Sequence, residues 1–124
     1  MSKITFRIKQ IETVSIRADF RVGDESGFVL LDAFVRKPDE NIEIFNQIKA
    51  LAEKEDKVGM LKLLYAGING LGDPSGFPIV GDAAFEEVAN GRLCGYLFTP
   101  IFKRYQQHYE EVDVTQVKRG NAGR

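Results

Sequence analysis

The sequence predicts an α+β protein, with an N-terminal antiparallel β-hairpin or small sheet of two or three strands followed by a C-terminal part of three or four helices. Up to about residue 37, apolar and polar side chains alternate, whereas after residue 38 apolar residues recur every three to four positions. The length of 124 residues, with 44% hydrophobic and 28% charged residues, fits one globular domain. We therefore expect a single domain over residues 1–113, with strands over about 1–37 and helices over 38–113, and a flexible tail over 114–124.

The N-terminal third has the pattern of strands. Residues 4–9 and 14–21 each alternate apolar and polar side chains, which predicts two strands, or one bent strand, with a single buried face. Residues 23–27 (Gly-Asp-Glu-Ser-Gly) predict a turn, because glycine allows positive φ and Asp and Ser side chains bond nearby backbone. Residues 28–35 then supply the partner strand, in which Asp32 has to reach an edge or solvent.

Two helices are expected next. Pro38 ends the strand segment, and Asp39 is a suitable N-cap for a first helix of about three turns. Asp56 is the expected N-cap of a second helix, whose end is marked by Gly67 and Gly70. The apolar positions that predict the two helices are Ile42, Phe45, Ile48, Leu51 and Ala52, followed by Val58, Leu61, Leu64, Tyr65 and Ile68.

A turn and two further helical segments complete the chain. Residues 73–76 (Asp-Pro-Ser-Gly) have the composition of a tight turn, and Asp82 is the expected cap of a short helix that ends at Asn90-Gly91. The last helix is predicted over residues 93–112. Pro100 lies inside this segment, and two alternatives stay open: Thr99 caps a new helix that Pro100 begins, or one helix kinks at Pro100.

Charge and composition exclude several classes of function. The net charge of −1 comes from acids and bases spread along the chain, which predicts neither nucleic-acid nor membrane binding. The single cysteine, Cys94, cannot form an internal disulfide, and the N-terminus has no apolar core of a signal peptide, so we expect a cytoplasmic protein. His108 is the only histidine, and we predict no metal site and no cofactor. The loop over residues 69–76 lacks both the acid spacing of a calcium loop and the lysine of a phosphate loop, so no catalytic residue is predicted.

The C-terminal half is rich in aromatic residues, and this surplus has two interpretations. Either both faces of the last helix are buried, one on the hairpin and one on other helices, or one face is exposed as a docking surface for a protein partner. The aromatic positions concerned are Phe77, Phe85, Tyr96, Phe98, Phe102, Tyr105 and Tyr109.

Residues 58–109 also carry an ordered series of motifs. The chain reads Tyr-Ala-Gly-Ile-Asn-Gly-Leu from Tyr65, Gly-Asp-Pro-Ser-Gly-Phe-Pro-Ile from Gly72, and Pro-Ile-Phe-Lys-Arg-Tyr from Pro100. This order resembles the C-terminal half of the tail assembly chaperones of long-tailed bacteriophages. In that family, a helix ending in a Gly-Ile/Val turn precedes a Gly-Pro loop and a final helix that bears a tyrosine. The family often has tryptophan before the glycine of that turn, where this chain has Tyr65-Ala66.

The resemblance, which spans residues 13–111, implies a non-catalytic role. Such a chaperone binds the hydrophobic tape measure protein in the host bacterial cytoplasm, keeps it soluble while the tail tube assembles, and is absent from the mature virion. The major tail tube protein and further copies of this chain are the other partners considered. The alternative is a structural tail-completion or head-tail connector subunit. The residues expected to contact protein partners are Leu64, Ile68, Phe77, Phe98, Ile101, Phe102, Tyr105 and Tyr109.

Overall fold

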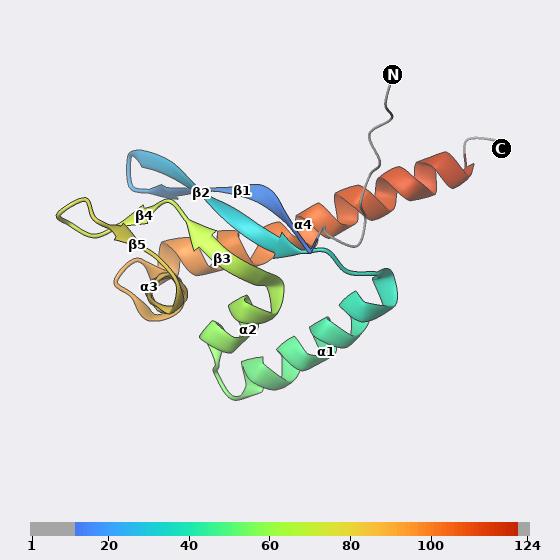
Figure 1. The fold of residues 1–124 in the computed structure, drawn as a ribbon, viewed down its shortest axis with the longest axis horizontal. Coiled ribbons are helices and arrows are strands. Elements are labelled where there is room, and N and C mark those ends of the chain that lie inside the picture. Colours follow the sequence, from blue (N-terminus) through green and yellow to red (C-terminus); the bar gives the residue numbers. More distant parts are fainter. Residues whose placement is uncertain (1–11, 122–124) are drawn as a thin grey trace, which may run out of the picture.

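The structure, a computed structural model, describes residues 12–121, and describes side chains as far as Glu111. It has a three-stranded antiparallel sheet, a two-stranded hairpin and four helices in the described part of the chain (Figure 1). The predicted α+β class is therefore confirmed. The strand predicted over residues 4–9 lies outside the described residues.

A long hairpin forms the first two strands, as the alternating pattern predicted. Strands β1 (Thr13–Val22) and β2 (Glu25–Phe34) pair antiparallel, and the pair Val22 and Glu25 closes the turn. Gly23 has φ of 62° whereas Asp24 does not have positive φ, which matches a two-residue type II′ turn. The paired residues of one face are buried, and those of the other face are largely exposed.

The third strand is a correction to the predicted second helix. Helix α2 (Lys57–Leu64) ends at Leu64, and β3 (Tyr65–Asn69) starts at the next residue. Strand β3 pairs antiparallel with β2, which places Ile68 opposite Leu31. A short apolar run fits both the helical and the strand period. Here it forms a strand, because the edge of β2 that β1 leaves unpaired offers backbone groups to bond with. Gly67 and Gly70 therefore do not end the helix.

The starts of the first two helices differ in how well they were predicted. Helix α1 (Pro38–Glu53) has Lys37 as its N-cap, not Asp39, because proline is well suited to the first helical position. Asp39 and Glu40 lie in the first turn, and Glu40 accepts the Lys37 backbone N–H at 2.9 Å. The cap of α2 is confirmed, since Asp56 accepts the backbone N–H of Gly59 at 2.9 Å.

The remaining elements include two further corrections. Strands β4 (Leu71–Gly72) and β5 (Pro78–Ile79) form a small hairpin, and α3 (Asp82–Asn90) has Gly81, not Asp82, as its N-cap. Gly91 follows α3 with φ of −77°, which is extended rather than left-handed backbone. Helix α4 (Cys94–Asn121) continues through Pro100, so no new helix begins there. Its backbone is helical through Asn121, and the flexibility predicted for residues 114–124 stays a prediction.

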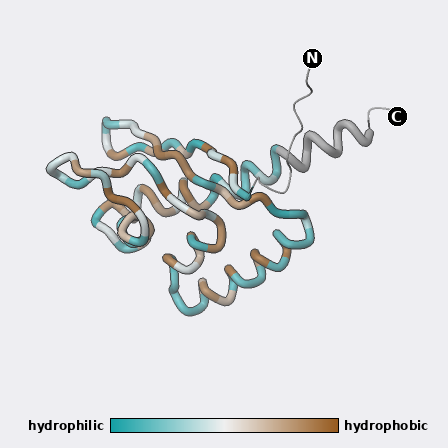
Figure 2. The backbone as a smooth tube through the Cα atoms, in the orientation of Figure 1, coloured by the Kyte–Doolittle hydropathy of each residue, from teal (hydrophilic) through white to brown (hydrophobic). Residues whose placement is uncertain are grey.

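The core lies between one face of the sheet and helices α2, α3 and α4. Helix α4 packs along β1, while α1 packs chiefly on α2 at the periphery (Figure 1). Hydrophobic positions form a run in the middle of β2, whereas in β1 and α1 they alternate with hydrophilic ones (Figure 2). None of the described helices combines the length and apolar character of a membrane span. The buried hydrophobic residues are Ile16, Ala18, Val29, Leu31, Ala33, Ile48, Met60, Leu61, Leu64, Tyr65, Ile68, Ala84, Phe85, Val88, Ala89, Leu97, Ile101 and Tyr105.

Candidate functional site

The described residues include no cluster of side chains suited to holding a metal ion. Among the described residues, no group of three or more His, Cys, Asp or Glu side chains could hold a metal ion. Cys94 and His108 are each half-buried on α4. Burial lowers the pKa of His108, the Arg104 charge lowers it further, and Glu111 opposes the shift. The candidate site is therefore sought among apolar side chains at the surface.

Four of the eight residues predicted to bind a partner belong to the core instead. Leu64 and Ile101 are fully buried, and Ile68 and Tyr105 are 2% exposed. They are not accessible to a partner in this conformation, and their predicted role in binding stays a prediction. For Ile101 and Tyr105, the interpretation in which this side of the last helix is buried is the correct one.

The polar ends of the buried tyrosines find partners inside the core, which explains their burial. The Tyr65 hydroxyl donates to the carbonyl oxygen of Ile101 at 2.5 Å, and the Tyr105 hydroxyl donates to Asn41 Oδ1 at 2.6 Å. The two rings meet edge to face, with centroids 6.0 Å apart. A buried hydroxyl with a good acceptor costs little, so tyrosine serves here as a core residue.

Three of the other predicted residues are half-buried on α4. The rings of Phe98 and Phe102 stack with centroids 5.6 Å apart, and the Lys57 ammonium lies 5.4 Å from the Phe98 centroid. Tyr109 is half-buried one turn after Tyr105. These side chains are therefore only partly accessible to a partner.

Phe77 is the predicted residue that is most exposed, and it has apolar neighbours in the same region. The β4–β5 hairpin and the junction between α3 and α4 lie at the same end of the molecule (Figure 1). Their exposed apolar residues, which we call the hairpin-end surface, are Phe77 (70% exposed), Val80 (64%), Leu93 (39%) and Tyr96 (50%).

Hydrogen bonds in the β4–β5 hairpin hold Phe77 in its exposed position. Asp73 Oδ1 accepts the backbone N–H groups of Ser75 and Phe77 at 2.9 and 3.0 Å, and the Asp73 N–H donates to the Phe77 carbonyl at 2.8 Å. The Gly76 N–H donates to the Asp73 carbonyl, which confirms the predicted turn. The backbone of Phe77 is thus fixed at both its N–H and its carbonyl, while the ring faces solvent.

Sequence reasoning missed Val80 and Leu93 as surface residues. Leu93 fits the apolar stripe of the last helix, but it precedes the first residue of α4 and is not covered by the sheet. Val80 follows the half-buried Ile79, and the alternation of a strand was the signal that could have placed its side chain outward.

A second exposed apolar area lies on the outer face of the sheet. Phe28 is 47% exposed and Leu30 is 42% exposed, both on β2. The Arg17 guanidinium lies 3.8 Å from the Phe28 centroid, and Arg17 also pairs with Asp19 at 2.9 Å. Because a cation already covers the Phe28 ring, this area is less open to a partner than the hairpin-end surface.

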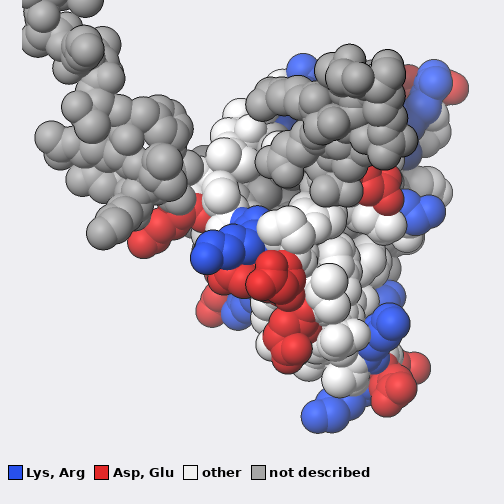
Figure 3. Space-filling model, turned by 90° about the vertical axis from the view of Figure 1, so that its right-hand side faces the viewer, with Lys and Arg blue, Asp and Glu red and all other residues white. Residues whose placement is uncertain are grey.

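Two shallow clefts are lined by charged side chains. One, of about 450 Å³, lies between β1 and α4 and includes Arg17, Asp19, Lys103 and Arg104. The other, of about 410 Å³, lies beside α1. Acidic and basic side chains are mixed on the face seen from the right-hand side of Figure 1 (Figure 3).

Comparison with known proteins adds no relative. No protein-family model matches the chain, and neither a curated protein nor a solved structure matches it.

Proposed function

We propose that this protein is a non-catalytic tail assembly chaperone of a long-tailed bacteriophage, which binds the tape measure protein in the host bacterial cytoplasm and is absent from the mature virion. The order of the glycine, proline and tyrosine motifs between Tyr65 and Tyr105 supports the family, and the exposed hairpin-end surface supports a binding role. That surface is the single observation on which the binding role rests.

The chemistry of the hairpin-end surface suits an apolar helix as the ligand. Aromatic and branched side chains on a preformed backbone can cover the apolar face of a helix without a large ordering cost. Burying one such side chain contributes about 2 kcal/mol, which corresponds to roughly thirtyfold in affinity. Phe77 and Tyr96 together therefore account for a large part of the binding free energy we expect.

The test is co-expression with the tape measure protein encoded in the same genome, with soluble yield and co-purification as readouts. We expect soluble tape measure protein to be recovered with this chain in molar excess. The double variant Phe77→Ser with Tyr96→Ser should lose most of the recovery. The matched control is Phe28→Ser with Leu30→Ser, which removes two exposed apolar side chains from the outer sheet face and should keep it.

Two outcomes decide against the proposal. If tape measure protein stays insoluble with the wild-type chain, the chaperone role is rejected. If the chain is instead present in purified particles and forms a stable closed ring, the structural alternative of a tail-completion or connector subunit replaces it. Loss of recovery only in the control variant would move the binding surface to the outer sheet face.

A further inference from the structure

Helix α1 is held to the rest of the molecule by few buried side chains. Of its residues, all of which the structure describes, Ile48 is the one buried hydrophobic residue and Asn41 the one buried polar residue. Ile44, Phe45 and Leu51 are only half-buried. Since burial of apolar side chains supplies most of the free energy that holds a helix in place, α1 opens more easily than α2, where Leu61 and Leu64 are fully buried.

Tyr105 on α4 makes the main described contacts between α4 and α1. The Tyr105 hydroxyl donates to Asn41 Oδ1 at 2.6 Å, and the edge of the Phe45 ring meets the Tyr105 ring with centroids 6.2 Å apart. Asn41 is 2% exposed, so its side-chain oxygen depends on this donor. Removing the hydroxyl alone leaves the Tyr105 ring in the core but breaks the polar contact with α1.

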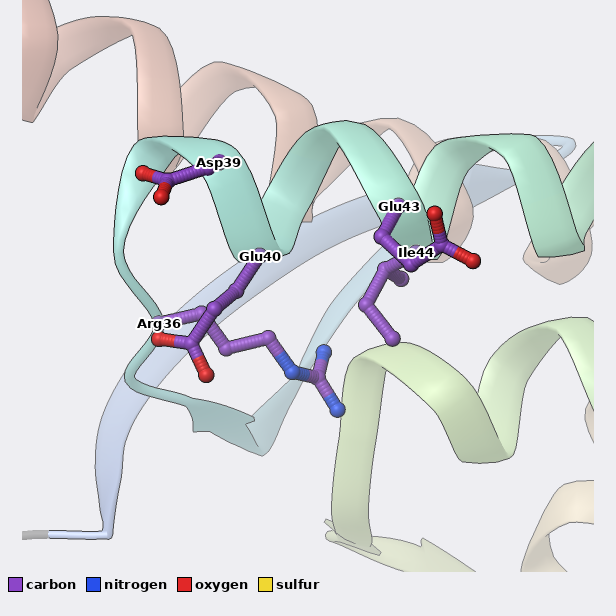
Figure 4. A pocket seen from close by; sticks show the side chains of 5 residues that line it. All are labelled: Arg36, Asp39, Glu40, Glu43 and Ile44. Atoms are coloured by element: carbon purple, nitrogen blue, oxygen red, sulfur yellow. The ribbon is translucent and has the colours of Figure 1, made fainter.

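The space beside the N-terminal half of α1 is open rather than packed. The cleft of about 410 Å³ is lined by Arg36, Asp39, Glu40, Glu43 and Ile44. Glu40 extends from α1 toward the backbone of residues 36–37, where its carboxylate accepts the Lys37 N–H, while Ile44 extends to the side of the Arg36 guanidinium and Asp39 points away (Figure 4). Arg36 in turn donates to the carbonyl of Leu63 on α2, so the segment before α1 is anchored to the body.

Non-helical segments flank α1 on both sides and define where it can pivot. Residues 35–37 precede it, and Glu55, in the connection to α2, has φ of 58°, a left-handed conformation that costs a non-glycine residue about 1 kcal/mol. The segment before α1 is thus held at Arg36, while α1 itself contacts the rest of the molecule chiefly through Asn41, Phe45 and Ile48.

We propose that α1 is a lid: it opens when the Tyr105–Asn41 hydrogen bond breaks, and the surface it uncovers around Tyr105 accepts an apolar helix of the tape measure protein. The second half rests on the proposed function. The surface beneath α1 already fits a helix, because α1 itself is a 16-residue amphipathic helix that covers it. A partner helix that replaces α1 gains the contacts that α1 gives up. Because only the open molecules can bind it, the small open fraction lowers its apparent affinity.

Amide hydrogen exchange of the free protein tests the lid directly. We expect residues 38–53 to exchange faster than the strands over residues 13–34 in the wild type. Tyr105→Phe should speed the exchange of residues 38–53 by roughly tenfold, because it removes one hydrogen bond and leaves Asn41 without its donor. Tyr65→Phe is the matched control: it also removes one buried hydroxyl, but that hydroxyl bonds Ile101 and not α1. If α1 and the strands exchange equally slowly, or if the two variants change the exchange of α1 equally, the proposal that α1 is a lid is contradicted.

Binding of the tape measure protein tests the second half separately. If α1 opening limits binding, Tyr105→Phe should raise the affinity by about the factor by which it raises the opening, while Tyr65→Phe should not. Wild-type binding with no gain in Tyr105→Phe, despite faster exchange of α1, would reject the lid as the gate and leave the proposed function intact. No binding by any variant would reject the proposed function while the exchange data still decide the lid.

Discussion

Arg104 on α4 donates its Nε–H to the backbone carbonyl of Arg17 on β1 at 2.7 Å. In the described part of the chain, no strand pairs with this side of β1, so its outward carbonyls are available to another strand. Exposed edges of this kind promote association between chains, and a charged side chain bonded to the edge blocks it. Arg104 therefore protects the middle of β1.

Replacing Arg104 with methionine should promote self-association with little change in stability. The variant loses a charge-assisted hydrogen bond, but it also removes the buried Arg104 Nη1, which has no partner among the described atoms. Each effect is on the order of 1–3 kcal/mol and they oppose each other. Light scattering after size exclusion should detect dimers or larger species of Arg104→Met. Lys103→Met, at the exposed neighbouring position, should behave as the wild type, and a monomeric Arg104→Met would contradict the role of the edge.

The protein should lose stability as pH rises above 10. Burial raises the pKa of Tyr65, against the opposing effects of its hydrogen bonding and of Arg104, and burial likewise raises the pKa of Tyr105 against the effect of Arg36. The unfolded chain releases these protons near pH 10 while the folded chain keeps them, so the stability is complete below pH 10 and falls above it. Each tyrosine contributes at most about 1.4 kcal/mol per pH unit.

Urea unfolding at pH 8, 10 and 11 measures this effect. Tyr65→Phe should reduce the loss of stability between pH 10 and 11 relative to the wild type. A free energy of unfolding that stays constant above pH 10 would be incompatible with two buried, protonated tyrosines.

Two positions of positive φ should respond in opposite directions to substitution. Gly70 has φ of 113°, and an added Cβ would lie 3.5 Å from the Phe28 carbonyl oxygen and from Val29 Cα. Gly70→Ala should therefore destabilise the fold by about 1–2 kcal/mol, mainly through backbone strain. Glu55→Gly, at φ of 58°, should be neutral or stabilising by up to about 1 kcal/mol, because it relieves such strain. Thermal unfolding of the pair tests this, and a more stable Gly70→Ala would show that the assigned backbone conformation is wrong.

Asp73→Ala should loosen the hairpin that carries Phe77 without unfolding the domain. The substitution removes the acceptor of two backbone N–H groups, both at an exposed position, so the global free energy of unfolding should fall by no more than about 1 kcal/mol. Hydrogen exchange over residues 71–79 should accelerate. Ser75→Ala keeps the backbone N–H that Asp73 accepts and serves as the control. If both variants exchange alike, the Asp73 carboxylate does not order the hairpin.

The sequence predicted the fold best where a long pattern had one interpretation. The alternation over residues 14–21 and the aspartate at position 56 led to the correct hairpin and the correct cap of α2. The boundary at Leu64 could not be predicted, because Tyr65 and Ile68 fit a helix stripe and a strand equally well. The free edge of β2, which decides between them, is a property of the tertiary structure. Pro100 was ambiguous for a related reason: the packing of α4 along β1 keeps the helix continuous despite the missing N–H.

The candidate site was harder to predict than the fold. An apolar stripe on a helix has the same spacing whether it faces the core or a partner, so Ile101 and Tyr105 were placed at the surface although they are buried. Phe77, named from the surplus of aromatic residues in the C-terminal half, is exposed, and its role in binding stays a prediction. The exposure of Leu93 and Tyr96 depends on where the sheet ends relative to α4, which the sequence does not encode locally.

The burial of Tyr65 and Tyr105 also makes the folded state visible to ultraviolet spectroscopy. The chain has four tyrosines and no tryptophan, so its near-ultraviolet absorbance and emission above 300 nm are free of indole. Half of the phenols therefore lie in a rigid apolar setting with their hydroxyls bonded to amide oxygens, while Tyr96 is open to water. Unfolding transfers the two inner phenols to water, and the chain thereby carries its own chromophores for following that transition without an attached dye.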